Sequence, residues 1–389
     1  RTPCLRAANP LWMRQLGGLL GWLCGPVDAG TRRHELAADS TIATADLGAE
    51  REACVVAPLT PNQLREGMTA SATSVLPFDA QRFRRVKQLQ EAKRNQGSVE
   101  LMRDGGSFVA VKKMPTRWIR SSPDEFDAKH PDSSEKPWVD VGIVRRLNEI
   151  GYPYAVKLVG VFADGESTYV VSSLASEGDL FGWCECDPKP GPRREEAMHP
   201  LTRDIFNGVR WLHDLNIAHR DLSLENLLLH SDNGGLRVKI IDFGMSSLSR
   251  SVVAEVRGKQ SYQAPELYLQ RPFDTFMADT FSLGVVLFAM GAQDYPWSST
   301  KRNACELFEY VCTFGFSKFL RKRKVRKGGG ESLADVFSPS FKALLVGLLA
   351  KDAAHRLTLG EKCFMSAEGS HDARRTSVWD CKWMQQPPQ

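Results

Sequence analysis

Short runs of apolar residues, several of them alternating with polar residues, predict a β-rich region in the first half of the chain. The triplet Asp104-Gly105-Gly106 and the pair Asp164-Gly165 are typical of tight turns, so each is expected to join two neighbouring strands. The strands that this pattern predicts are residues 84–89, 98–103, 107–114, 156–163 and 168–174. The pattern therefore predicts a small, mainly β unit that ends near Leu174.

Apolar residues at helical spacing predict helices on both sides of this boundary. Residues 138–150 and 201–215 each place their apolar side chains on one face. The polar, proline-bearing stretch 115–137 is expected to form a long loop, and the charged stretch 185–196 a surface insertion. Strands followed by helices indicate an α+β fold.

The composition allows a large core without indicating a particular ligand. A chain of 389 residues with 42% hydrophobic content can form two or three structural units. The formal charge of +5 is mild for this length, so it gives no support for nucleic acid as a partner. The nine cysteines are scattered and include no C-x-x-C pair, which argues against a zinc site and a disulfide-dense scaffold.

A polar loop between two apolar runs carries the residues with the clearest chemistry. In the stretch His219-Arg220-Asp221-Leu222-Ser223-Leu224-Glu225-Asn226, the Asp221 carboxylate suits a substrate hydroxyl, and the Asn226 amide suits a metal ion. A short apolar strand then leads to Asp242-Phe243-Gly244, which supplies a second metal-binding carboxylate. The sequence therefore predicts a site at which these side chains converge.

These two motifs and the later triplet Ala264-Pro265-Glu266 resemble the catalytic loop, the metal loop and the end of the activation segment of the eukaryotic protein kinases. The stretch Val109-Ala110-Val111-Lys112 resembles their nucleotide-binding strand. The resemblance implies a bilobal fold, with a small β-rich lobe at residues 78–174 and a larger helical lobe at 175–365. It also implies transfer of the γ-phosphate of ATP to protein serine or threonine hydroxyls, with Mg2+ as cofactor.

The resemblance assigns catalytic roles to four residues. Asp221 would accept or orient the proton of the substrate hydroxyl, and Lys112 would contact the nucleotide phosphates. Asn226 and Asp242 would hold Mg2+. Serine/threonine specificity is favoured over tyrosine because Tyr262-Gln263-Ala264-Pro265-Glu266 lacks the tryptophan-bearing form of the tyrosine kinases.

Further residues around the site follow from the same resemblance. The adenine and ribose of ATP are expected beside Ser173, Ala175 and Asp179. Two structural contacts are also implied: Asp279 is expected to anchor the catalytic loop, and Arg356 is expected to pair with Glu266.

The chain departs from the family at the glycine-rich phosphate loop. The positions of its three glycines hold Ala92, Arg94 and Gly97, so only the last glycine remains. Glycine is used there because backbone N–H groups can then approach phosphates closely. The charges of Lys93 and Arg94 are expected to replace that function, unless the loop contributes little. The missing glycines resemble the with-no-Gly-loop branch of the secreted rhoptry and dense-granule kinases of apicomplexan parasites.

Two further departures concern charge. The helix position that usually carries a glutamate holds Ile143, and Asp140 on the same face is the predicted partner of Lys112. Ser223 stands where serine/threonine kinases usually carry a lysine that neutralises the transferred phosphate, so either catalysis is slowed or another lysine or arginine substitutes. These departures favour the alternative that the chain is a pseudokinase, a binding or scaffolding module without turnover.

Four serines follow the metal loop, and a phosphate on one of them is a hypothetical partner for Arg220. These serines are Ser246, Ser247, Ser249 and Ser251. Such a pair would order the activation segment, which runs from Gly244 to Glu266, through a charge-assisted bond.

The regions outside the predicted kinase domain carry weaker signals. Residues 1–77 are expected to be an extension, in which the apolar stretch 11–24 is either a signal remnant, a membrane-contacting helix or a helix that packs on the domain. Thr60-Pro61 is a predicted helix start. The basic run 318–327 is expected to be a solvated loop, with an acidic partner or a membrane surface as the alternative, and residues 366–389 a polar tail. The resemblance implies secretion to a rhoptry, dense granule or parasitophorous vacuole, with a cytoplasmic location as the alternative.

Overall fold

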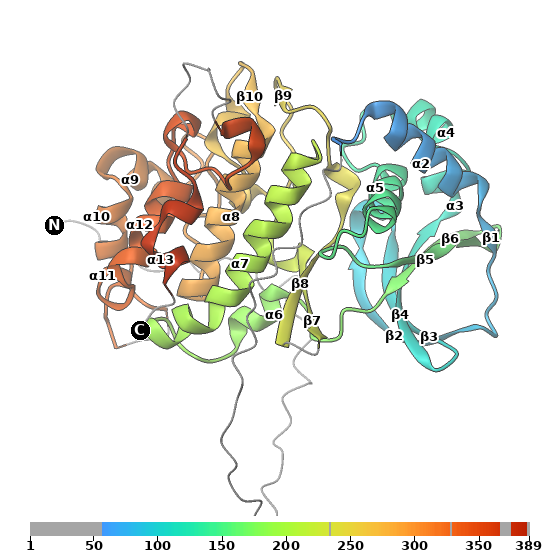
Figure 1. The fold of residues 1–389 in the computed structure, drawn as a ribbon, viewed down its shortest axis with the longest axis horizontal. Coiled ribbons are helices and arrows are strands. Elements are labelled where there is room, and N and C mark those ends of the chain that lie inside the picture. Colours follow the sequence, from blue (N-terminus) through green and yellow to red (C-terminus); the bar gives the residue numbers. More distant parts are fainter. Residues whose placement is uncertain (1–56, 233–234, 327–328, 366–374, 387–389) are drawn as a thin grey trace, which may run out of the picture. The chain divides into compact units, whose positions relative to one another are not determined.

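The computed structural model describes residues 57–232, 235–326, 329–365 and 375–386 (Figure 1). The expectations for residues 11–24 fall outside this part of the chain. From Pro58 onward the described residues form one unit, which contains a sheet-rich small lobe and a helical large lobe. The predicted α+β fold is therefore confirmed.

The small lobe is built on a six-stranded sheet in the order β1-β5-β6-β4-β3-β2, in which β1 and β5 pair in parallel and the other neighbours are antiparallel. All five predicted strands are present. The strands are β1 (Leu76–Pro77), β2 (Phe83–Ala92), β3 (Gly97–Asp104), β4 (Ser107–Pro115), β5 (Leu158–Ala163) and β6 (Ser167–Ser173). Lys112 on β4 lies between Val99 of β3 and Val170 of β6, so its backbone is held from both sides.

Helices cover one face of this sheet, as Figure 1 shows. They are α2 (Pro61–Thr73), α3 (Thr116–Ile119), α4 (Pro123–Lys129) and α5 (Pro137–Glu149). The predicted loop at residues 115–137 is wrong, because Trp118, Ile119 and Phe126 on α3 and α4 are buried in an apolar cluster with residues of α2 and α5. Such burial outweighs the polar, proline-bearing composition.

The predicted helix start at Thr60 is confirmed, since its side chain accepts a hydrogen bond from the Gln63 N–H in a capping box that opens α2. The stretch 58–77, which was placed in the extension on sequence grounds, thus supplies α2 and β1 to the small lobe.

The large lobe is organised around a buried helix, α8, which has nearly every residue enclosed. Among the described helices α8 is the one long and apolar enough to cross a membrane, and 94% of that window is buried inside the lobe. The α-helices are α6 (Leu180–Glu185), α7 (Pro192–Asp214), α8 (Thr275–Ala292), α9 (Glu306–Phe314), α10 (Phe316–Lys322), α11 (Leu333–Val336), α12 (Pro339–Leu348) and α13 (Lys382–Gln385).

Short strands and 3-10 turns complete the chain. The strands of the large lobe are β7 (Leu227–Asp232), β8 (Gly235–Ile240), β9 (Ser251–Val252) and β10 (Phe273–Asp274). The 3-10 turns are η1 (Lys93–Asn95), η2 (Leu224–Asn226), η3 (Phe243–Met245), η4 (Gln260–Tyr262), η5 (Pro265–Tyr268), η6 (Ala353–His355), η7 (Lys362–Phe364) and η8 (Val378–Asp380).

Two predictions for charged stretches of the large lobe are wrong in part, because a helix occupies part of each stretch, although most of the described charged side chains in them are exposed. Helix α7 begins at Pro192, inside the predicted surface insertion, and the side chain of Glu195 is fully buried. Its carboxylate accepts hydrogen bonds from the Ser338 N–H (2.7 Å) and from Trp383 Nε1 (3.1 Å), which compensates the cost of burying the charge. The basic run at 318–327 begins as α10, whose Phe319 and Leu320 are buried.

Candidate active site

The catalytic loop is fixed from below by α8. Asp279 Oδ2 accepts a hydrogen bond from the His219 N–H (2.7 Å), and Asp279 Oδ1 accepts one from the Arg220 N–H (2.8 Å). Arg220 has a left-handed backbone conformation with φ of 66°. That conformation is strained for a residue other than glycine. The two hydrogen bonds to Asp279 therefore stabilise the turn that positions Asp221. The predicted anchor is confirmed as a contact.

The same aspartate continues into a buried charge network. His213 is fully buried, with Nε2 3.1 Å from Asp279 Oδ2 and Nδ1 2.7 Å from Glu361 Oε1. Burial alone would lower the pKa of His213, but the hydrogen bonds to the two carboxylates outweigh it and raise the pKa to about 9. The protonated histidine therefore offsets two buried negative charges behind the catalytic loop.

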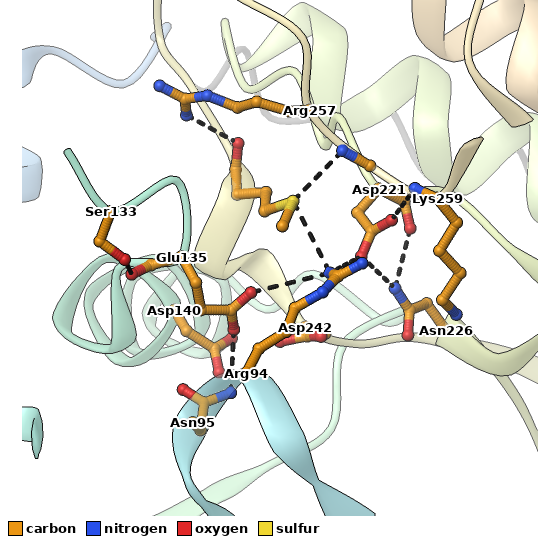
Figure 2. Close-up of polar contacts among 12 residues, drawn as sticks. Arg94, Asn95, Ser133, Glu135, Asp140, Asp221, Asn226, Asp242, Arg257 and Lys259 are labelled. Carbon is orange, nitrogen blue, oxygen red and sulfur yellow. Dashed lines mark hydrogen bonds and ion pairs between the residues drawn. The ribbon is translucent and has the colours of Figure 1, made fainter. Parts of the chain in front are cut away.

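The three residues predicted to face the reacting phosphate converge, as Figure 2 shows. Asn226 Nδ2 donates to the Asp221 carbonyl oxygen (2.8 Å), which ties the two ends of the catalytic loop together. Asp242 is brought to the same place by β8 and the left-handed turn at its own position, where φ is 67°. The side chains of Asp221, Asn226 and Asp242 thus lie close together, where the two lobes meet.

Lys112 reaches this space from the sheet. Its Nζ lies 3.1 Å from Asp242 Oδ1, 3.4 Å from Asp140 Oδ2 and 3.9 Å from Glu135 Oε1. Burial alone would lower the pKa of Lys112, but these carboxylates outweigh it and raise the pKa, so the ammonium stays charged.

The predicted contact between Lys112 and Asp140 is present. Asp140 Oδ1 also accepts a hydrogen bond from the Phe243 N–H (2.9 Å), so one carboxylate links α5 to the metal loop and to β4. Ile143, at the aligned glutamate position, is fully buried. The side chain at that position thus belongs to the core, and the carboxylate that contacts Lys112 lies one turn earlier on the helix, at Asp140.

Glu135 was missed by the sequence reasoning. It lies just before α5 and is buried, and its Oε1 accepts a hydrogen bond from Asn95 Nδ2 (3.0 Å). Burial and the nearby Asp242 raise the pKa of Glu135 to about 7. A Cβ on Gly244 would lie 2.8 Å from Glu135 Oε1, so the glycine of the metal loop makes room for this carboxylate. No periodicity marked Glu135, because it belongs to no helix.

The segment in place of the glycine-rich loop folds as η1, and its Arg94 points into the site (Figure 2). Arg94 Nη1 lies 2.7 Å from Asp221 Oδ2 and 3.8 Å from Glu135 Oε2. The surviving Gly97 has a packing role, since a Cβ there would overlap the carbonyl oxygen of Lys113 on β4. A cation from the small lobe therefore stands beside the predicted catalytic aspartate.

The residues expected beside adenine and ribose are partly engaged by the protein. The Ser173 N–H donates to the Lys157 carbonyl oxygen (2.8 Å), and the Ser173 hydroxyl accepts a hydrogen bond from the Lys157 N–H (2.9 Å). Ala175 is half-buried. Asp179 caps α6, accepting a hydrogen bond from the Gly182 N–H (2.8 Å), and burial raises its pKa.

The activation segment is held by a carboxylate of its own. Arg220 Nη1 lies 2.7 Å from Glu255 Oε2, and Arg220 Nη2 donates to the Glu255 carbonyl oxygen (2.8 Å). Burial alone would raise the pKa of Glu255, but Arg220 outweighs it and lowers the pKa. Glu255 thus occupies the place that the sequence suggested for a phosphoserine. Ser246 is buried, and its hydroxyl donates to the His219 carbonyl oxygen (3.3 Å).

The end of the segment is locked by the predicted pair. Arg356 Nη1 lies 2.6 Å from Glu266 Oε1, and Arg356 Nη2 lies 3.0 Å from Glu266 Oε2. The guanidinium also donates to the Met277 carbonyl oxygen (2.6 Å), so the pair ties η5 to α8.

The oxygen atoms of Asp242 and Asn226 suit a magnesium ion. Asn226 uses its Nδ2 on the Asp221 carbonyl, so the amide oxygen is the atom that it can offer to a cation. Burial alone would raise the pKa of Asp242, but Lys112 outweighs it and lowers the pKa, which keeps the carboxylate charged. Hard oxygen ligands of this type are those that Mg2+ prefers.

Comparisons with known proteins agree with this arrangement. A family model described as "Protein kinase domain" matches residues 95–366. The chain is 32% identical over 217 residues to serine/threonine-protein kinase grp of Drosophila melanogaster, a match that covers 54% of this chain and 38% of the relative. It is 28% identical over 192 residues to calcium/calmodulin-dependent protein kinase type 1 of Macrobrachium nipponense, which covers 49% of this chain and 50% of the relative.

The matched part spans half or less of the length of these two relatives. The family model, by contrast, covers well over half of this chain and includes the catalytic loop, the metal loop and both partners of the Glu266–Arg356 pair. The chain therefore belongs to the protein kinase family.

Proposed function

We propose that this protein is a serine/threonine protein kinase that transfers the γ-phosphate of ATP to a hydroxyl group of a protein substrate. Protein kinases in general use ATP with Mg2+. The observation that carries the proposal is the convergence of Lys112, Asp242, Asp221 and Asn226, which come from separate elements of both lobes. Serine/threonine specificity is supported by the form of the Tyr262–Glu266 stretch and by the similarity to a serine/threonine-protein kinase.

The roles follow from the contacts. Lys112, charged and 18% exposed at its side chain, is placed to hold nucleotide phosphates. Asp221 is placed to orient the substrate hydroxyl and accept its proton. Asn226 and Asp242 would hold Mg2+, which supplies charge neutralisation for the phosphates when bound. Catalysis would then depend mainly on positioning and electrostatic stabilisation.

Arg94 is proposed to take over part of the phosphate contact that glycines usually provide. Its side chain is 40% exposed and lies beside Asp221 and Glu135, so it is accessible from the space between the lobes. A guanidinium binds phosphate through two parallel charge-assisted hydrogen bonds. Nucleotide phosphates would thus replace the carboxylates as its partners.

A phosphotransfer assay tests the enzyme proposal. Wild type is expected to label a serine- and threonine-containing protein with ATP and Mg2+. Asp221→Ala is expected to lose at least ~100-fold of that rate, the usual contribution of a positioned acid–base group. Asp242→Ala is expected to lose a similar factor because it removes a ligand of the magnesium ion. Asp132→Asn, an exposed aspartate of the same protein, is the matched control and should equal wild type. Equal labelling by all four proteins would contradict the proposal.

The pseudokinase alternative is favoured by one observation, the ion pair between Arg94 and Asp221. A guanidinium on the catalytic carboxylate neutralises the group that would accept the proton. A pseudokinase would be stabilised by ATP in a thermal melt while wild type and Arg94→Met both fail to label any substrate. If wild type labels a substrate, that result is sufficient to exclude the pseudokinase alternative.

Branch and location are further proposals. The missing glycines support the with-no-Gly-loop branch, to which neither relative named above points. The resemblance to that branch supports secretion, and the apolar stretch 11–24 supports a peripheral membrane contact, with a cytoplasmic location as the alternative. Export of a reporter fused to residues 1–57 tests secretion. Liposome flotation with and without residues 1–30 tests the membrane contact, and equal flotation would contradict it.

A further inference from the structure

The catalytic loop lacks a cation at position 223, but the activation segment brings one there. Ser223 lies two residues after Asp221 and is fully buried. Lys259 Nζ donates a hydrogen bond to Ser223 Oγ (2.7 Å) and lies 3.0 Å from Glu225 Oε2. The ammonium group therefore sits against the catalytic loop, although Lys259 is 36 residues away in the sequence.

The backbone of the same lysine is attached to the catalytic aspartate. The Lys259 N–H donates to Asp221 Oδ1 (3.0 Å), the carboxylate oxygen that Arg94 does not contact (Figure 2). Lys259 is thus held at both ends, by its peptide on Asp221 and by its ammonium on Ser223. Its side chain is 32% exposed, so the protein does not enclose it.

The residue before Lys259 explains how the two segments come so close. Gly258 has φ of 84°, a conformation that L side chains rarely adopt, and a Cβ there would lie 2.7 Å from the Arg220 carbonyl oxygen. Glycine is therefore required at this position for the activation segment to lie directly on the catalytic loop. The placement of Lys259 is built into the backbone and does not depend on its side-chain contacts alone.

We propose that Lys259 is the catalytic cation for phosphoryl transfer and replaces the lysine that protein kinases usually carry at the position of Ser223. The inference rests on the proposed function and deepens it. In the transfer, the substrate hydroxyl oxygen forms a bond to the γ-phosphorus, and the bond from that phosphorus to the β–γ bridging oxygen breaks. The hydroxyl proton passes to Asp221 and ADP leaves. The positive charge of Lys259 stabilises the negative charge on the equatorial oxygens of the transferred group.

Besides Lys112, Arg94 is a further cation in the site, and its attachment differs from that of Lys259. Arg94 comes from the small lobe and its closest ionic partner is Asp221 Oδ2. Lys259 is fixed to the catalytic loop itself through three contacts, with Asp221, Ser223 and Glu225. A donor fixed before the reaction needs no reorganisation when charge develops, which favours Lys259 for the transition state and Arg94 for nucleotide binding.

Relocating the charge provides the test. Lys259→Met keeps an unbranched side chain that is one atom shorter and removes its charge. Lys259→Met combined with Ser223→Lys returns a lysine to the catalytic loop. We expect Lys259→Met to lower kcat by about 10² to 10³, the usual loss for one preorganised donor, with little change in KM for ATP. The double variant should recover kcat to within about tenfold of wild type, and Lys259→Arg should retain it. Lys301→Met, an exposed lysine of the large lobe, is the matched control and should equal wild type.

The double variant separates a catalytic role from a structural one, because it restores the charge without restoring the bond between Lys259 and Ser223. Thermal melts establish that each variant is folded. Unchanged kcat in Lys259→Met would overturn the inference. So would a folded double variant no faster than Lys259→Met. In both cases an active wild type leaves the proposed function standing, whereas a wild type without phosphoryl transfer would overturn the function and the inference together.

Discussion

In the large lobe, the charged residues that support the catalytic loop and the activation segment are buried, and each has fixed partners. In the small lobe, by contrast, the side chain of Arg94 is 40% exposed and lies between the carboxylates of Asp221 and Glu135. Asp279, His213 and Arg356 are at most 3% exposed and bond to backbone groups and carboxylates. Enclosed charges cannot change partners without leaving another charge buried and unpaired. The partly exposed Arg94 can exchange its carboxylate partners for those of a bound ligand. The first set should thus control folding, and the second should control activity.

The largest effect is expected from breaking the lock at the end of the activation segment. Arg356→Ala leaves the Glu266 carboxylate buried without its partner, and we expect a loss of about 3 to 5 kcal/mol in the free energy of unfolding. Urea denaturation measures it. Arg145→Ala breaks an exposed pair with Glu149 on α5 and should cost less than about 1 kcal/mol. Equal losses in the two variants would contradict the contrast between enclosed and exposed charges.

The next effect is a pH dependence of stability from His213. Its pKa in the folded protein, about 9, lies above the ordinary value of 6.5. The charged form is therefore favoured by folding, so its contribution is fully present below about pH 6.5 and is lost as the pH rises through 9. The difference amounts to about 3 kcal/mol.

Unfolding curves of wild type and His213→Gln between pH 6 and 9.5 measure this contribution, since titrations common to both proteins cancel in the difference. The difference in the free energy of unfolding between wild type and His213→Gln should shrink as the pH rises. An advantage that is constant or grows over this range would show that His213 is neutral in the folded protein.

A smaller effect, and one on activity, is expected in the cleft. Arg94→Met removes a partly exposed charge, so the free energy of unfolding should change by less than about 1 kcal/mol. The KM for ATP should rise about tenfold, the equivalent of about 1.4 kcal/mol of phosphate binding. Lys93→Met is the control, because Lys93 is 69% exposed and contacts only Glu91 among the ion pairs of the described residues. A KM that rises equally in both variants would contradict a specific role for Arg94.

The smallest effect should come from Glu255. Glu255→Gln weakens an ion pair with Arg220 in which the glutamate is 42% exposed, so stability should fall by at most about 1 kcal/mol and kcat by less than about fivefold. Glu331→Gln, an exposed glutamate, should change neither. Because Glu255 already supplies the negative charge, mass spectrometry of active protein should find the serines after the metal loop unmodified. If activity required phosphate on one of these serines, phosphoserine and not Glu255 would be the group that orders the activation segment.

The fold was predictable wherever pattern and chemistry coincide. The strands around Lys112 alternate with period two, and the anchoring role of Asp279 and the Glu266–Arg356 pair followed from motifs. Asp140 could be named as the partner of Lys112 because helical periodicity places it on the face of Ile143. The absence of glycine at positions 92 and 94 could also be read from the sequence, and the structure has η1 in this segment.

The rest depended on contacts that leave no local pattern. Glu135 lies in a connection, and only the folded chain brings it to Asp242 and Asn95. Glu195 was assigned to the surface because of its charge, but hydrogen bonds from Ser338 and Trp383, more than 140 residues away, allow it to be buried. Lys259 was foreseen only as an unnamed substitute for Ser223, because its partner lies in another loop.

One residue of the activation segment both steadies the Asp221 carboxylate with its peptide and brings a positive charge to Ser223 with its side chain. Any event that lifts this segment would withdraw the two together. Turnover in such an enzyme would be lost completely when the activation segment moves away. A lysine in the catalytic loop itself would still contribute its positive charge after the segment had moved.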